Sequence, residues 1–168
     1  MDGLDAEVAA GFRQAMRRLT ATVSLITTHH QGVRTGMAVT AVQSVAMDPA
    51  TLLICVNQSA SISVPLRERG RFAVNMLHLA HAELVPIFSG KLKGEARFEH
   101  GLWTSQEDVP VLVDAQAAIV CDVVGTSGIG SHDVIFGRVR WVRVREEISP
   151  LLYENGRVAR SEPLPLAG

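Results

Sequence analysis

Residues 133–145 read DVIFGRVRWVRVR, and this run decides the fold class because it is long enough to form a strand of a β-barrel. Its apolar side chains alternate at Val139 and Trp141 and then move by one position, to Val142 and Val144. Successive side chains of a strand point to opposite faces, so a regular strand keeps one phase. The shift of one position therefore predicts a β-bulge inside this strand.

Further segments have the β-branched and apolar composition of strands: residues 22–28, 37–46, 51–56, 71–77 and 117–124. The first of them is followed by a polar turn, His-His-Gln-Gly, at residues 29–32. Asp48-Pro49-Ala50 joins the second to the third, because proline fixes a turn and cannot donate to a central ladder. About six or seven strands are expected in all.

Short helices are expected between these strands. Residues 5–19 place Val8, Phe12 and Met16 at a spacing of four, which predicts one amphipathic helix. A second helix ends at Gly70.

A third short helix is predicted over residues 81–88, with Leu84, Val85 and Phe88 on one face. Residues 89–94 predict a flexible, basic loop, and the tail after Gly156 predicts an ordered or loosely docked coil. Most connections are too short for the helices of a doubly wound parallel sheet. We therefore expect a mainly β (α+β) fold, an antiparallel and closed or partly closed barrel, since closure also removes exposed sheet edges.

Length and composition limit the class of protein. The 168 residues correspond to a single domain, residues 1–168, with a core at about residues 8–153 and a C-terminal tail at residues 157–168. The chain is 47% hydrophobic with a net charge of −1, which argues against disorder and against a nucleic-acid partner. An acidic start and the lack of a long apolar run predict a cytoplasmic protein without a membrane segment.

Several motifs fail their usual tests. Residues 125–130 have the spacing G-x-x-G-x-G and precede a strand, so they predict a glycine-rich loop and not a dinucleotide fingerprint. The histidines at 29, 30, 78 and 81 match no metal motif and are interpreted as solvated loop and helix residues, so no metal is expected. Cys55 and Cys121 lie between aliphatic residues and predict inert, buried thiols.

Two polar features point to a ligand. The first is a hydroxyl-rich set at two strand ends, namely Thr40, Ser44, Asn57, Ser59 and Ser61. The small residues before the second helix offer backbone N–H groups and hydroxyls to an anion such as a phosphate. The alternative is an ordinary helix N-cap made by Ser61 or Ser63.

The second feature is Gly130-Ser131-His132-Asp133, which enters the long strand and places a histidine at the mouth of the barrel. The alternative is a hairpin turn in which Asp133 and Ser131 satisfy local backbone donors.

Taken together, these segments resemble the flavin reductase family, which has the split-barrel FMN-binding fold with a Greek-key-like antiparallel barrel. The pieces that carry the resemblance occur in family order between Phe12 and Tyr153: residues 12–16, 22–28, 36–49, 52–61, 72–77 and 130–133. The resemblance implies an NAD(P)H:flavin oxidoreductase that serves a two-component monooxygenase.

The resemblance also implies the site. It places the flavin ring, ribityl chain and phosphate against Met37, Ala38, Val39, Thr40, Ala41, Ser44, Val45, Cys55, Val56, Asn57, Ser59, Ala60, Ser61 and Lys91. It places the pyridine nucleotide against Gly130, His132, Asp133, Tyr153 and Arg157, with His132 near the hydride path as the catalytic residue and Asp133 fixing the loop. Ala38 is a departure, because many relatives have Thr or Ser there and gain one more side-chain hydrogen bond.

In this interpretation FMN or FAD is the flavin, NADH or NADPH is the co-substrate, and the protein is a homodimer that passes reduced flavin to a partner oxygenase. Hydride transfer between two bound rings needs orientation and not an acid–base pair, so none has to be visible. Two other hypotheses are a flavin-binding electron-transfer or storage protein without nucleotide-dependent turnover, and a barrel that mediates protein interactions without any cofactor.

Overall fold

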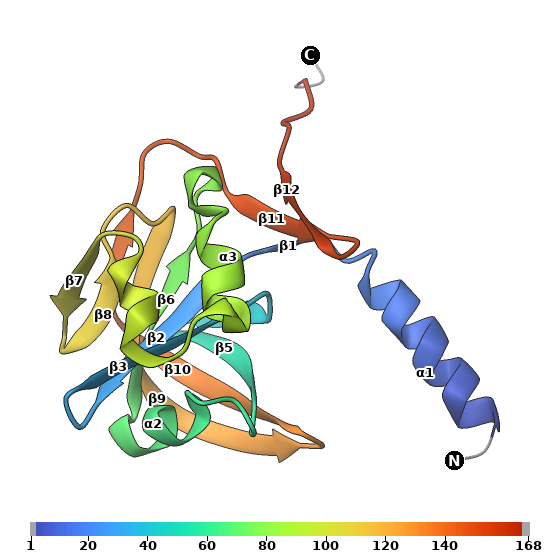
Figure 1. The fold of residues 1–168 in the computed structure, drawn as a ribbon, viewed down its shortest axis with the longest axis horizontal. Coiled ribbons are helices and arrows are strands. Elements are labelled where there is room, and N and C mark those ends of the chain that lie inside the picture. Colours follow the sequence, from blue (N-terminus) through green and yellow to red (C-terminus); the bar gives the residue numbers. More distant parts are fainter. Residues whose placement is uncertain (1–2, 166–168) are drawn as a thin grey trace.

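The computed structural model describes residues 3–165, so Met1, Asp2 and the end of the predicted tail at residues 166–168 lie outside the described part. Figure 1 shows a barrel-like body from which the N-terminal helix extends. The helices are α1 (Gly3–Met16), α2 (Ser63–Arg69), η1 (Leu79–His81), α3 (Leu84–Pro86), η2 (Ile87–Lys91) and η3 (Gly94–Glu99). The strands are β1 (Ala21–Thr22), β2 (Ser24–His30), β3 (Val33–Val39), β4 (Val42–Met47), β5 (Ala50–Asn57), β6 (Arg71–Met76), β7 (Trp103–Gln106), β8 (Val109–Leu112), β9 (Ala117–Ile129), β10 (His132–Val144), β11 (Leu151–Glu154) and β12 (Arg157–Arg160).

The main sheet has seven strands in the order β3-β2-β6-β9-β10-β5-β4, and every neighbouring pair is antiparallel. The mainly β, antiparallel architecture predicted from the sequence is therefore confirmed. Two smaller sheets, β1-β11-β12 and β7-β8, complete the fold.

The chain between β3 and β4 shows how the main sheet curls. The predicted single strand at residues 37–46 is wrong, because it is two strands separated by Thr40 and Ala41. These two strands lie at opposite ends of the sheet order. A link from Val39 to Val42 spans at most about 11 Å, so the two edges of the sheet must approach each other here. The sheet is thus bent into a barrel, with its seam at Thr40 and Ala41.

The longest strand pair contains the predicted irregularity. The register of β9 and β10 shifts between Val139 and Trp141, which confirms the β-bulge, and it shifts again between Phe136 and Gly137. The predicted glycine-rich loop at residues 125–130 is wrong, because β9 continues to Ile129. Pairing with β10 outweighs the weak strand propensity of glycine, and only Gly130 and Ser131 make the turn.

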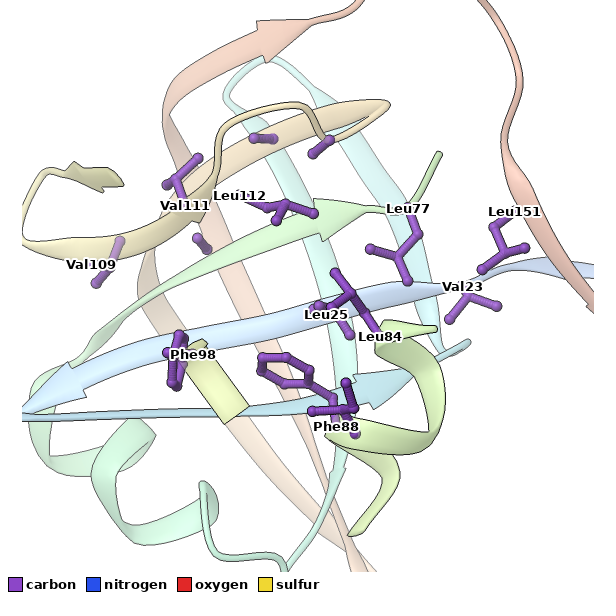
Figure 2. Close-up of a cluster of buried hydrophobic side chains, with 14 of the residues drawn as sticks. Val23, Leu25, Leu77, Leu84, Phe88, Phe98, Val109, Val111, Leu112 and Leu151 are labelled. Carbon is purple, nitrogen blue, oxygen red and sulfur yellow. The ribbon is translucent and has the colours of Figure 1, made fainter. Parts of the chain in front are cut away.

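Two buried clusters pack on the sheet. One contains Ile26, Ile54, Phe72 and Ile135 together with Leu66 of α2. The other packs β2 and β6 against the segment that follows β6, and Figure 2 shows Leu84 and Phe88 pointing toward Leu25 in this cluster.

Residues 81–94 differ from the predicted helix and flexible loop. They form three short turns, η1, α3 and η2, and η3 begins at Gly94. The backbone of Gly90 has a φ of 121°, which interrupts regular helical geometry. Leu84 and Phe88 are buried as expected, whereas Val85 is half-buried.

The predicted helix at residues 5–19 is confirmed as α1, and the predicted helix that ends at Gly70 is confirmed as α2. The hairpins β7–β8 and β11–β12 were not predicted. The predicted coil after Gly156 is wrong for residues 157–160, which pair with β11 as β12, and it is confirmed for residues 161–165. Within residues 3–165, no helix combines the length and apolar character that crossing a membrane requires.

Candidate functional site

A cavity of about 400 Å³ opens at the barrel seam. It is lined by Val23, Met37, Ala38, Val39, Thr40, Ala41, Cys55, Asn57, Val85, Ser89, His132 and Tyr153. The seam brings β3 next to the end of β5 and the start of β10, and the β11–β12 hairpin adds Tyr153. Residues from distant parts of the sequence, including those predicted for a flavin and for a nucleotide, therefore meet in one cavity.

The remaining predicted residues are not among the residues that line this cavity. Ser44 and Val45 are exposed on β4, and Lys91 is exposed at the end of η2. Val56 is fully buried in the barrel interior, because it alternates with Cys55 along β5. The others lie in turns or at strand starts: Ser59, Ala60, Ser61, Gly130, Asp133 and Arg157. Three lining residues were not predicted: Val23 and Val85, which are apolar, and Ser89, which begins the predicted basic loop.

Strand β3 supplies main-chain groups to the cavity. It is an edge strand whose only partner in the sheet is β2. The N–H of Arg34 donates to Glu95, and the C=O of Gly36 accepts from Arg97, so these alternate residues turn their backbone groups away from β2. Ala38 follows in the same outward row, because antiparallel ladders alternate with a period of two. The backbone N–H and C=O of Ala38 therefore face outward where the strand borders the cavity.

The outward backbone groups of Ala38 offset the side-chain hydrogen bond that a Thr or Ser at this position would make. A planar heterocycle whose edge carries both a donor and an acceptor can pair with the outward N–H and C=O of one residue. The cavity has the volume of a small-molecule site. Most of its wall surface is apolar, and no Asp, Glu, Lys or Arg is among its lining residues. Such a lining fits the ring system of a flavin.

The loop after β5 is organised by Asn57. The Asn57 Oδ1 accepts hydrogen bonds from the backbone N–H of Ser59 at 2.8 Å and from its hydroxyl at 2.7 Å. The predicted N-cap by Ser61 or Ser63 is wrong, because Ile62 precedes α2 and makes no side-chain cap. Asn57 forms an Asx-type turn with Ser59, before the helix begins.

Asp133 connects the two polar features found in the sequence. Its carboxylate accepts a hydrogen bond of 2.9 Å from the Gln58 side chain and lies 3.7 Å from the Arg67 guanidinium. The backbone N–H of Gln58 also donates to the Ser131 carbonyl at 3.0 Å. The alternative interpretation is confirmed in its hairpin turn, at Gly130 and Ser131, but it is wrong for Asp133, whose partners are the side chains of Gln58 and Arg67. The carboxylate holds the loop after β5 against the β9–β10 turn.

The two cysteines differ in environment. Burial raises the pKa of the Cys121 thiol to about 12, with a smaller contribution from the nearby charge of Asp122, so this thiol is inert as predicted. Cys55 was predicted to be buried, but it is half-buried and lines the cavity.

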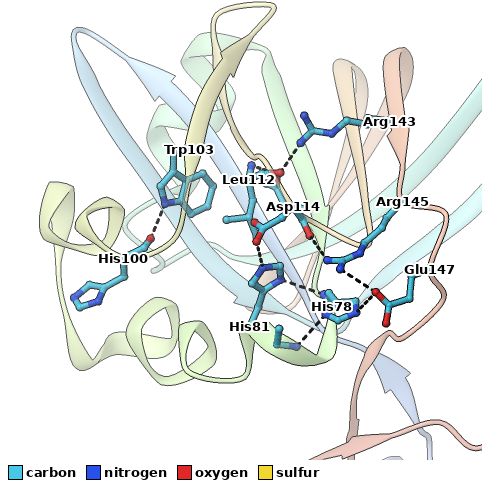
Figure 3. A network of polar contacts seen from close by, with 11 residues as sticks. His78, His81, His100, Trp103, Leu112, Asp114, Arg143, Arg145 and Glu147 are labelled. Carbon is cyan, nitrogen blue, oxygen red and sulfur yellow. Dashed lines mark hydrogen bonds and ion pairs between the residues drawn. The ribbon is translucent and has the colours of Figure 1, made fainter.

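The interpretation of His78 and His81 as solvated residues is wrong, because both are buried. The Nδ1 of His78 accepts from the Ala80 N–H, and the Nδ1 of His81 accepts from the His78 N–H. Their Nε2 atoms face carboxylates, at 3.1 Å between His81 and Asp114 and at 3.7 Å between His78 and Glu147 (Figure 3). This network ties η1 to the segments before β9 and after β10, away from the cavity.

The contact with His81 changes the pKa of the Asp114 carboxyl. Burial alone raises the pKa of its carboxyl, but the hydrogen bond and charge of His81, with a further contribution from Arg145, bring the pKa below its ordinary value. His81 and Asp114 are therefore interpreted as a structural pair.

A larger cavity of about 760 Å³ lies between the β2–β3 hairpin and the β7–β8 turn and shares no lining residue with the first. Its arginines are paired within the chain, Arg34 with Glu95 at 2.7 Å and Arg69 with Asp108 at 3.6 Å. These arginines therefore do not form an uncompensated site for the phosphates of a nucleotide.

Comparison with known proteins agrees with this geometry. Residues 16–162 match the family model described as a flavin reductase like domain. The chain is 37% identical over 161 residues to "FMN reductase (NADH) RutF 1" of Methylorubrum extorquens, covering 95% of this chain and 80% of that protein. It is 40% identical over 163 residues to the reductase component of an FADH(2)-dependent resorcinol hydroxylase from Rhizobium sp., covering 95% and 91%. Among solved structures, the styrene monooxygenase flavin reductase from Pseudomonas putida S12 superposes with a TM-score of 0.83 at 27% identity, covering 93% and 99%.

Proposed function

The chain belongs to the flavin reductase family, and from this membership we propose that it is an NADH-dependent flavin reductase that supplies reduced flavin to a partner oxygenase. The observation that carries the proposal is the cavity at the barrel seam, where residues expected to contact a flavin and residues expected to contact a nucleotide border the same space. We propose NADH, and not NADPH, as the co-substrate, because the similar FMN reductases are named for NADH.

The flavin ring is proposed to lie in the cavity with its polar edge on the backbone of Ala38. Met37, Val39, Thr40, Ala41 and Cys55 would border the ring, while Ser44, Val45 and Val56 belong to the strands that carry it. The polar loop Asn57–Ser61 would hold the ribityl chain and phosphate, since its hydroxyls are exposed beside the cavity, and the exposed Lys91 would add a positive charge. Asn57 keeps this loop in shape through its bonds to Ser59.

The nucleotide is proposed to enter over the β9–β10 turn. Gly130 and Asp133 form and fix this turn, and His132 and Tyr153 border the cavity from two sides. Arg157 is exposed at the start of β12 and would meet a phosphate of the nucleotide. The chemistry of the two bound rings is hydride transfer from nicotinamide C4 to flavin N5. The protein's part is to hold the rings in contact and to exclude water from between them.

A steady-state assay tests the proposed function. NADH and NADPH are each combined with FMN, FAD and riboflavin, and loss of the nicotinamide absorbance is followed. We expect turnover with NADH that depends on added flavin. Flavin binding without any nucleotide oxidation would instead favour an electron-transfer or storage protein.

His132 is expected to orient the nicotinamide without being an obligatory proton donor. In His132→Ala the KM for NADH should rise by about tenfold while kcat changes little, because an orienting contact is lost and the chemistry stays with the two rings. FMN affinity, measured by fluorescence quenching, should stay the same. His29→Ala, which removes a histidine from the other cavity, is the matched control. Loss of FMN binding with unchanged NADH affinity would contradict this role.

A homodimer is proposed because of α1. This helix extends from the barrel in Figure 1, and its apolar residues Val8, Phe12 and Met16 are 63%, 63% and 47% exposed. A helix of this length is marginally stable in water unless its apolar face is covered. A second copy of the chain, which carries the same apolar face, is the proposed cover.

Phe12→Asp should therefore weaken dimerisation by about 100-fold or more, because two apolar side chains per dimer lose their burial. Light scattering after size exclusion measures the effect as a concentration-dependent fall to monomer mass. Gln14→Asp changes the opposite face of the helix and should leave the mass unchanged. A Phe12→Asp variant that keeps the mass of the unmodified protein would show that this face is not the interface.

We further propose a cytoplasmic location. NADH is available there, and both cysteines are free, which suits a reducing compartment.

A further inference from the structure

Arg97 is the arginine that is buried within residues 3–165, with only 7% of its surface exposed. Its guanidinium donates to two backbone carbonyls, from Nη1 to Gly36 and from Nε to Leu92 at 2.9 Å. No carboxylate of the described chain lies within 4.0 Å of it. A buried charge without an ionic partner is costly to maintain, so its presence calls for an explanation.

The neighbouring cation provides a contrast. Arg34 lies on β3, the strand whose Gly36 carbonyl accepts from Arg97. It is bound to Glu95 through both its backbone N–H, at 2.6 Å, and its guanidinium, at 2.8 Å. Its positive charge is therefore compensated, while that of Arg97 is not. Burial lowers the pKa of Arg97 from its ordinary value, but an arginine remains protonated in proteins.

The two carbonyls that bind Arg97 lie close in sequence to residues that line the cavity. Gly36 precedes Met37 on β3, and Leu92 follows η2, whose Ser89 also lines the cavity. Gly36 and Ala38 share the outward row of β3 and are separated by about 7 Å along the strand. A ring that is hydrogen-bonded to Ala38 would then lie on the order of 10 Å from the guanidinium.

Resting on the proposed function, we propose that Arg97 is a specificity-determining residue that makes the cavity prefer reduced flavin to oxidised flavin. Oxidised isoalloxazine is neutral, whereas the reduced ring carries a negative charge once its N1 proton is released to solvent. A fixed positive charge behind the cavity attracts only the second form. In an interior with an effective dielectric constant of about 20, a charge at this distance changes affinity by about tenfold.

The test compares dissociation constants of FMN in its two redox states. Oxidised FMN and FMN reduced with dithionite are titrated anaerobically into the full chain by calorimetry. The unmodified protein should bind reduced FMN more tightly. In Arg97→Met this preference should fall by about tenfold, and Arg97→Lys, which keeps the charge, should retain most of it. Arg34→Met is the matched control, because the Arg34 guanidinium is partly exposed and its charge is screened by water, so its loss should leave the preference nearly unchanged.

A purely structural role for Arg97 would weaken both redox states equally, and that result would overturn the proposal. So would tighter binding of oxidised FMN by the unmodified protein, a measurement that does not depend on whether Arg97→Met folds. If the unmodified protein neither binds FMN nor oxidises NADH in its presence, the proposed function itself is wrong and this inference falls with it. Turnover with no preference for reduced FMN overturns the inference alone.

Discussion

Gly137→Ala is expected to lower the free energy of unfolding by about 3 kcal/mol, because the added methyl group has no space. A Cβ at position 137 would lie 2.6 Å from Cζ of Phe72 and 2.8 Å from Cβ of Cys121. Both neighbours are fully buried, and a Cβ atom moves only with its own backbone. The strands β9 and β10 would have to separate where their register already shifts. Urea denaturation followed by circular dichroism measures the change.

Gly125→Ala is the matched control for this variant. Gly125 lies in the same strand pair, opposite Phe136, but a Cβ there would meet its nearest neighbour at 3.6 Å, which is an ordinary contact. This variant should be close to the unmodified protein in stability. Equal stability of the two alanine variants would show that the core around Phe72 relaxes freely, contrary to the close packing described above.

Asp133→Ala is expected to weaken FMN binding by about 10- to 100-fold, the effect of leaving a buried polar contact unmade. Asp133 is 5% exposed, and its carboxylate joins Gln58 to the β9–β10 turn. Without it, the loop that is proposed to hold the flavin phosphate loses its attachment to the turn that is proposed to hold the nucleotide. Fluorescence quenching of FMN by the protein gives the dissociation constant, and kcat/KM for NADH should fall as well.

Asp133→Asn separates the two contacts of this carboxylate. The amide oxygen still accepts from Gln58, while the charge that faces Arg67 is removed. The Arg67 contact is long and partly exposed, so the asparagine variant should bind FMN nearly as well as the unmodified protein. Asp122→Ala, which breaks an ion pair with Arg71 outside the cavity, is the control. The role assigned to Asp133 would be wrong if its alanine variant bound FMN normally.

Local sequence patterns were sufficient to predict the bulge in β10, the end of α2 and the antiparallel architecture. The bulge in β10 follows from one displaced apolar position, and the end of α2 follows from Gly70, whose φ of 68° is the left-handed conformation that glycine favours. The antiparallel architecture follows from the short connections between strands. In each case the decisive interaction lies within a few residues.

Features that depend on distant contacts could not be predicted in this way. The break at Thr40 and Ala41 is imposed by barrel closure, and nothing in those two residues marks a strand end. The burial of His78 and His81 depends on carboxylates more than 30 positions away. The uncompensated burial of Arg97 likewise results from its packing against β3 and was not predicted.

The candidate site was predicted only in part. Its residues were selected through a family resemblance, and those at positions 37–41, Cys55, Asn57, His132 and Tyr153 all border one cavity. The attachment of the Asn57 loop to Asp133 through Gln58 was not foreseen, because an exposed glutamine has no pattern of its own. Whether each of these residues contacts flavin or nucleotide stays a prediction.

The outward row of β3 has a consequence for how this protein can diversify. Every amino acid except proline presents the same amide and carbonyl, so a ligand held by the main chain of position 38 places little demand on the residue found there. Neighbouring lining positions are then free to accumulate substitutions that reshape the walls for bulkier or smaller flavins, or for a different oxygenase. A library randomised at Met37 and Val39 would explore that freedom while the anchoring pair of atoms stays in place.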